Sequence, residues 1–229
     1  MTQRRGTNPH PALVSYPAKA AFGRTLPKNK VYEHSSANSR LKDIFVKEVE
    51  QIVWQYKLAP ETINLPARLS VPEIQVFSIQ LKTSKLNRDV LRAIDVAVQF
   101  PILFELGFDN SVQVVACYKQ FNEGEGSRGI LSDYFETDWL PADSQRTPMP
   151  LALDLASLYE QLLCRLIPLQ ARPQEPVSAL VERFGQVQAR QREVTRAAAL
   201  LGKERQFNRK VEINATIRKL KAELEQLSE

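Results

Sequence analysis

The sequence predicts an α/β protein (α+β-like) with a compact body, in which helices flank a small mixed sheet, and a C-terminal antiparallel helical hairpin. In the body, apolar residues at three- and four-residue spacing alternate with short apolar runs rich in β-branched residues. Three prolines, Pro168, Pro173 and Pro176, then interrupt the chain. Beyond them, apolar residues recur in steps of four and three to the end of the chain, which is typical of long paired helices.

These patterns divide the 229 residues into four segments. Residues 1–30 form a basic, Pro-containing leader without periodicity, so we expect an irregular segment there. Residues 31–168 form the α/β body, residues 169–176 a Pro-rich linker, and residues 177–229 the helical hairpin arm.

In the first half of the body, the sequence predicts a helix, then a strand, then a second helix. Apolar residues from Leu41 to Val53 recur at helical spacing, so we expect a helix that begins near Ser39 as its cap and ends near Pro60. Residues 71–82 are rich in Ile, Val and Phe and predict a strand. Asn87 is expected to cap the next helix, which Pro101 ends.

The second half of the body predicts a hairpin and a covering helix. Residues 102–106 and 112–121 read as strands joined by a turn at 107–110, and residues 134–140 as a further strand after a loop at 122–126. After Pro150, leucines from Leu151 to Leu166 predict a strongly apolar helix over the sheet.

Two apolar seams in different phases define the arm. They comprise Leu180, Phe184, Val187, Gln191, Val194, Ala198 and Leu201, and then Ile213, Ile217, Leu220, Leu224 and Leu227. One continuous seam would keep its register, so the phase change predicts two helices folded back at residues 202–205, with Gly202 as the helix stop. The hairpin could pack on itself, bind a partner groove or form a homodimer.

Charge is segregated along the chain. The net charge is +5, but residues 1–30 contain six Lys/Arg and no acid, and residues 176–229 contain eleven Lys/Arg against seven Glu, so the intervening body is acidic at −5. Basic ends attract nucleic acid or an acidic protein surface, or they keep a protein soluble.

Other features narrow the class of protein. No apolar run reaches the roughly 20 residues of a membrane span and no secretory signal is evident, so we expect a cytoplasmic protein that does not enter membranes. Two cysteines (Cys117, Cys164) and two histidines (His10, His34) argue against a disulfide framework, a zinc site and a histidine-based triad. We therefore predict no metal, no cofactor and no catalytic residue.

The predicted binding site lies at the bend of the arm. Cations there can neutralise phosphates, and amides can donate hydrogen bonds to backbone or bases. The same residues could instead organise the hairpin and face solvent. This bend cluster comprises Lys203, Arg205, Gln206, Asn208, Arg209, Lys210 and Asn214.

A metal-dependent nuclease is the enzymatic alternative. Such a site needs an acid on one strand and an acid-x-Lys on the next, and the nearest approximation is Glu105, Asp109 and Lys119. Cys117 stands where the second acid is required, so an active or degenerate nuclease is the less favoured interpretation. Arg92 and Asp95 are expected to pair across one turn at the surface.

Aromatic residues on the proposed strands form a further candidate surface. They could stack on bases beside Lys119 and Arg128, although packing within the sheet is the favoured interpretation. They are Tyr118, Phe121, Tyr134, Phe135 and Trp139.

The sequence resembles an uncharacterised bacterial family, the domain of unknown function numbered forty-three ninety-one. Residues 26–30, 45–54, 57–65, 73–77, 93–95, 101–105 and 203–214 carry the resemblance. The family is similar to ones found beside helicase and DNA-methyltransferase genes in restriction-like phage-defence loci. The resemblance therefore implies a non-catalytic accessory subunit that binds DNA or a helicase or methyltransferase partner; a purely structural adaptor is the other alternative.

Overall fold

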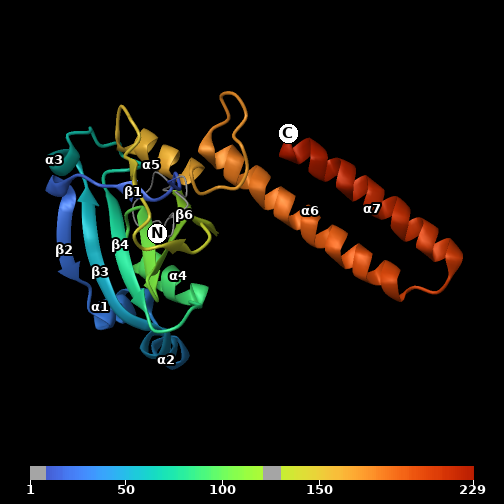
Figure 1. The fold of residues 1–229 in the computed structure, drawn as a ribbon, viewed down its shortest axis with the longest axis horizontal. Coiled ribbons are helices and arrows are strands. Elements are labelled where there is room, and N and C mark those ends of the chain that lie inside the picture. The colour runs from blue at the N-terminus through green and yellow to red at the C-terminus, as the bar shows by residue number, and fades with distance from the viewer. Residues whose placement is uncertain (1–8, 121–129) are drawn as a thin grey trace, which may run out of the picture. The chain divides into compact units, whose positions relative to one another are not determined.

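The computed structural model describes residues 9–120 and 130–229 and divides the chain into two compact units, residues 1–166 and 167–229. The first unit is an α/β body and the second contains the two longest helices (Figure 1). The predicted mixed α/β fold and the C-terminal pair of helices are both confirmed.

A seven-stranded mixed sheet forms the first unit. Its strands are β2 (Ala21–Thr25), β3 (Val49–Leu58), β4 (Ile74–Leu81), β5 (Ile102–Phe108), β6 (Ser111–Gln120) and β7 (Ile130–Glu136), in that spatial order, and β8 (Leu140–Pro141) pairs with β6. Only β4 and β5 are parallel neighbours, and α4 (Arg88–Ala97) connects them. The other pairs are antiparallel, and a two-residue hairpin joins β5 and β6.

Helices α1 (Lys28–Ser35), α2 (Ser39–Glu48) and α4 pack against one face of the sheet. Alternate strand residues such as Phe77 and Phe104 point into this layer and are almost completely buried with Leu91 and Ile94 of α4. Because strand side chains alternate between faces, Glu105 points to the opposite side. There the short parallel pair β1 (Val14–Ser15) and β9 (Thr147–Pro148) lies close to the sheet, since Arg146 bonds both Glu105 and the Val14 carbonyl.

The leader prediction is wrong for the residues that the structure describes. Residues 18–20 form a 3-10 helix, β2 is an edge strand on β3, and Lys28 begins α1. Leu13 and Val14 are fully buried. The leader orders because it covers apolar sheet residues, a tertiary contact that its own lack of periodicity conceals. Residues 1–8, including Arg4 and Arg5, lie outside the described part.

The predicted helix from Ser39 to Pro60 is also wrong beyond Glu48. Asn38, rather than Ser39, caps α2 by accepting a hydrogen bond from the Leu41 amide. The chain then passes directly into β3, which is hydrogen-bonded to β2 and β4 on its two sides. Pairing with two neighbours favours the strand for a segment rich in Val and Ile. A four-residue helix, α3 (Pro60–Ile63), follows.

The predictions for β4, the Asn87 cap and the hairpin of β5 and β6 are confirmed. Asp109 and Asn110 form the two-residue turn with φ values of 42° and 60°, the left-handed conformation that a type I′ turn requires and that Asp and Asn tolerate. The later strand is β7, which ends at Glu136, so the predicted span of 134–140 is displaced. The predicted loop at 122–126 lies outside the described residues.

The apolar helix after Pro150 is shorter than predicted. α5 (Leu155–Cys164) begins with a capping box in which Asp154 accepts from the Ser157 amide, and the Ser157 hydroxyl accepts from the Asp154 amide. Leu158, Tyr159 and Leu162 are buried, whereas Leu151 and Leu153 precede the helix and are almost fully exposed. Cys117 is buried, Cys164 is exposed, and these two described residues form no disulfide.

The second unit contains α6 (Val177–Lys203) and α7 (Phe207–Ser228), which pack on one another as an antiparallel pair. All five predicted seam residues of α7 are half-buried, and Leu180 and Val194 of α6 are buried, whereas Gln191 and Ala198 are exposed. Among the described residues, no helix is long and apolar enough to span a membrane.

Candidate functional site: the basic tip of the helical hairpin

The bend between α6 and α7 is a three-residue connection, residues 204–206, stabilised by its own acid. Glu204 Oε1 accepts hydrogen bonds from the backbone amides of Arg205 (2.7 Å) and Gln206 (2.9 Å). These bonds to the charged form lower the pKa of Glu204. Gly202 lies within the last turn of α6 and does not adopt a left-handed φ, so the predicted glycine stop is wrong and the acid provides the turn instead.

The structure places the whole bend cluster on exposed surface. Lys203 ends α6, Arg205 and Gln206 lie in the bend, and the other four residues belong to α7. Within the described residues, the side chains of Asn208 and Asn214 make no hydrogen bond, so nothing there shows them organising the hairpin. All seven side chains are exposed: Lys203, Arg205, Gln206, Asn208, Arg209, Lys210 and Asn214.

The net charge of the second unit is concentrated at this bend. Residues 167–229 contain twelve Lys/Arg and eight Asp/Glu, a net charge of +4. Residues 196–210 contain five of those cations, Arg196 included, and only one acid, Glu204. The remainder has seven of each sign and is neutral, so the tip, residues 196–210, carries the entire net charge of the unit.

The cations of the tip are largely without acidic partners. Arg209 lies 4.0 Å from Glu204 and its side chain is 69% exposed, which places this contact at the limit of an ion pair. Within the part of the chain that the structure describes, Lys203, Arg205 and Lys210 form no ion pair. Exposed, unpaired cations keep their charge available to an anionic ligand.

The opposite end of the hairpin is closed by a buried guanidinium. Arg183 donates to both carboxylate oxygens of Glu175 (2.8 and 2.7 Å) and to the backbone carbonyls of Gln170 and Leu227. These contacts join α6, the preceding linker and the last turn of α7, where the helix dipole favours a cation. The hydrogen bonds from Arg183 lower the pKa of Glu175 to about 2. Arg183 therefore connects α6 and α7 at the end of the hairpin opposite to the tip.

The alternative nuclease-like cluster is not assembled in the structure. Glu105 lies on β5 and forms a bidentate pair with Arg146, at 2.7 Å for both bonds. Asp109 lies in the hairpin turn. Lys119 points to the α4 face, opposite to Glu105, so the sheet itself separates the two side chains. Among the described residues, no group of three or more His, Cys, Asp or Glu side chains is placed to hold a metal ion.

Lys119 belongs instead to a buried polar cluster under α4. Its ammonium donates to the carbonyls of Asp95, Val98 and Phe100 (2.8 to 2.9 Å), which closes the C-terminal end of α4, and lies 3.2 Å from the Asp95 carboxylate. Tyr134 donates to Asp95 at 2.5 Å. Burial raises the pKa of Asp95, and Lys119 opposes that shift.

The expected surface pair of Arg92 with Asp95 is therefore wrong. Asp95 faces the interior, whereas Arg92 donates to the Ser132 carbonyl at 2.9 Å and lies over the Tyr134 ring at 5.1 Å. Helical spacing permits both arrangements, and the neighbouring strands select this one.

Packing accounts for the described members of the aromatic group. Tyr118 stacks on Tyr159, Tyr134 packs against Phe104, Trp139 packs edge-on against Phe108, and Phe135 is buried. Phe121 and Arg128 lie outside the described residues.

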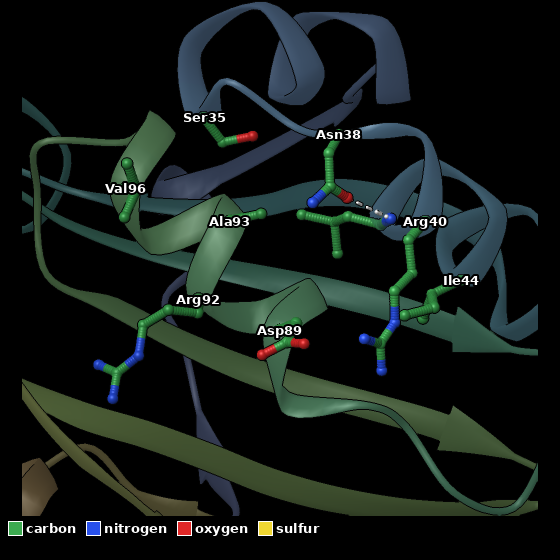
Figure 2. Close-up of a pocket in the computed structure, with 9 residues that line it drawn as sticks. Ser35, Asn38, Arg40, Ile44, Asp89, Arg92, Ala93 and Val96 are labelled. Carbon is green, nitrogen blue, oxygen red and sulfur yellow. Dashed lines mark hydrogen bonds between the residues drawn. The ribbon is translucent and has the colours of Figure 1, made fainter.

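One open pocket of about 340 Å³, which sequence reasoning missed, lies between α1, α2 and α4. Figure 2 shows Ser35, Asn38 and Arg40 of the α1–α2 segment facing Asp89 and Ala93 of α4 across it, whereas the Arg92 side chain lines its edge and points away from them. The Ser35 hydroxyl is buried without a hydrogen-bond partner among the described residues. Two cations, one acid and an apolar floor define no single class of ligand. Its lining was not predictable, because the three helices meet only in the folded body.

A family model described as "Domain of unknown function (DUF4391)" matches residues 14–224, so the chain belongs to this family. The match includes nearly all of the body and both helices of the hairpin. No curated protein and no solved structure matches the chain.

Proposed function

We propose that this protein is a non-catalytic accessory subunit that binds DNA through the basic tip of its C-terminal hairpin. The observation that carries the proposal is that residues 196–210 hold the entire net charge of the second unit on exposed side chains. Lys and Arg at such a surface neutralise phosphates and release counterions, whatever the base sequence. The proposed setting is cytoplasmic.

The charged residues of the body support the non-catalytic part of this proposal. The body's buried charges are engaged in structural pairs, Glu105 with Arg146 and Asp95 with Lys119. The resemblance to proteins encoded beside helicase and methyltransferase genes suggests that such a subunit delivers DNA to, or docks on, an enzyme of a restriction-like defence system.

Salt-dependent DNA binding tests the proposal. Fluorescence anisotropy with labelled DNA would be measured between 50 and 300 mM salt for the wild type and for the triple variant R205A/R209A/K210A, in which three exposed cations of the tip are removed. We expect weaker binding and a slope of log K against log salt that is shallower by about 3, roughly one unit for each lost phosphate contact.

A second triple variant controls for net charge. Arg218→Ala, Lys219→Ala and Lys221→Ala remove three exposed cations from α7 outside the tip. The proposal requires this variant to bind DNA much better than the tip variant. Absent binding by the wild type, or equal losses in the two variants, would reject the tip as the site, and co-purification with a helicase or methyltransferase would then test the adaptor alternative.

A further inference from the structure

The tip also exposes apolar side chains. Within residues 167–229, all of which the structure describes, the exposed large apolar residues are Leu200 (61% exposed), Phe207 (77%) and Val211 (51%). The other large apolar side chains of the hairpin are buried or half-buried in and beside its seam. Leu200 and Phe207 thus lie within the stretch that carries the net charge, residues 196–210, and Val211 directly follows it.

Phe207 occupies a particular place among the cations. It is the first residue of α7, directly after the bend, and Arg205, Arg209 and Lys210 are all within three positions of it. Val211 follows one helical turn later on the same side of α7. A ring exposed to 77% has little of its surface packed against the hairpin, so the fold gains little from it.

We propose that Phe207 stacks on unpaired bases, so that the preferred ligand of the tip is single-stranded DNA; this inference rests on the proposed function. Surfaces that bind single strands combine cations that follow the backbone with an aromatic ring that stacks on a base. A base in a duplex offers no free face unless neighbouring pairs are unstacked, which is unfavourable. A single strand offers its bases without that cost.

The charge of the tip favours this ligand over a protein groove. A partner that covered Phe207 by hydrophobic contact alone would also have to neutralise or bury Arg205, Arg209 and Lys210, and desolvating unpaired cations is unfavourable. A nucleic acid strand supplies a phosphate to each cation and a planar base to the ring. A single ligand class then accounts for both the charge and the exposed ring.

Binding of matched oligonucleotides tests the inference. Anisotropy would be measured for a 20-nucleotide single strand and the corresponding duplex, with the wild type, F207A, F207L and V211A. The wild type is expected to prefer the single strand. F207A should weaken single-strand binding by about 5- to 150-fold, the effect of one lost base stack, and should change duplex binding much less.

Two controls separate stacking from apolar contact. F207L keeps most of the apolar surface but removes the aromatic face, so it should behave like F207A, whereas V211A should retain single-strand binding. The fluorescence of 2-aminopurine within the strand should change on binding to the wild type and not to F207L. Equal affinity of the wild type for strand and duplex, or normal strand binding by F207L, would overturn the inference while leaving duplex binding by the tip intact. No binding to either DNA would reject the proposed function itself, and a protein bound through Phe207 would then be the occupant to seek.

Discussion

Replacing Lys119 by Met should destabilise the body strongly, although the new side chain is similar in length. The Lys119 side chain is only 3% exposed, and its ammonium donates to three carbonyl oxygens at the end of α4. Removing it leaves those carbonyls without a donor and leaves the Asp95 carboxylate buried without its cation. Breaking a buried pair from one side costs about 3 to 5 kcal/mol, a large fraction of the 5 to 15 kcal/mol typical of a domain.

Urea unfolding followed by tryptophan fluorescence measures this loss. Both tryptophans, Trp54 and Trp139, lie in the first unit, so the signal reports on the body rather than on the hairpin. Lys47→Met is the matched control, because Lys47 is exposed and should change the free energy of unfolding by less than about 0.5 kcal/mol. The double variant D95N/K119M should recover part of the loss, since position 95 then has no buried carboxylate that lacks its cation.

The pH dependence of the loss gives an independent check. Burial raises the pKa of Asp95, so its protonated form favours the folded state, and this contribution is greatest at low pH and is lost as pH rises through the folded pKa. Without Lys119 that pKa rises further. The deficit of K119M relative to the wild type should therefore shrink as pH falls from 7 toward 5. A deficit below about 1 kcal/mol at pH 7, or one that does not vary with pH, would refute the assignment of Lys119 as the counterion of Asp95.

Four further predictions concern other pairs and turns. R183M should loosen the base of the hairpin, seen as faster amide hydrogen exchange in the last turns of α7, because Arg183 contacts that end of the helix; unchanged exchange would contradict this connection. Since Arg183 lowers the pKa of Glu175 from 4.5 to about 2, the stabilising contribution of this pair should be present above about pH 4.5 and lost as pH falls toward 2; a hairpin whose circular dichroism melt is unchanged over that range would exclude it. E105A should cost about 2 kcal/mol in urea unfolding, as expected for lost hydrogen bonds to Arg146, and E105Q less; equal values would count against a charge-assisted pair. N110A should destabilise by about 1 kcal/mol and N110G should not, because residue 110 has a φ of 60°; equal stabilities would argue against a type I′ turn.

Features that depend on neighbours in the sequence were predictable. The Asn87 cap, the turn before Ser111 and β4 follow from side chains within a few positions of each feature, and the folding back of the arm follows from the phase change between its two apolar seams. The residues of the bend cluster were identifiable because their number and spacing are written in the sequence. Their exposure, and that of Phe207, became known only from the folded hairpin.

Two contacts of lysines at helix ends could not be predicted from the sequence. Lys28 resembles any other cation of the basic leader, yet its ammonium donates to the carbonyls of Phe45 and Val49 at the end of α2. Lys119 likewise closes α4 from β6. Both contacts join residues about twenty positions apart, and no local pattern distinguishes them from solvent-facing lysines.

By itself, the sequence determined the α/β class, the Asn87 cap, the turn before Ser111, the hairpin arm and the concentration of cations at its bend, because each depends on spacing or composition along the chain. Only the tertiary structure decided that residues 49–58 form a strand, that the leader joins the sheet, and that Lys119 and Glu105 lie on opposite faces of it. In these cases the free energy comes from contacts between distant segments, which outweigh the local preferences that sequence patterns report.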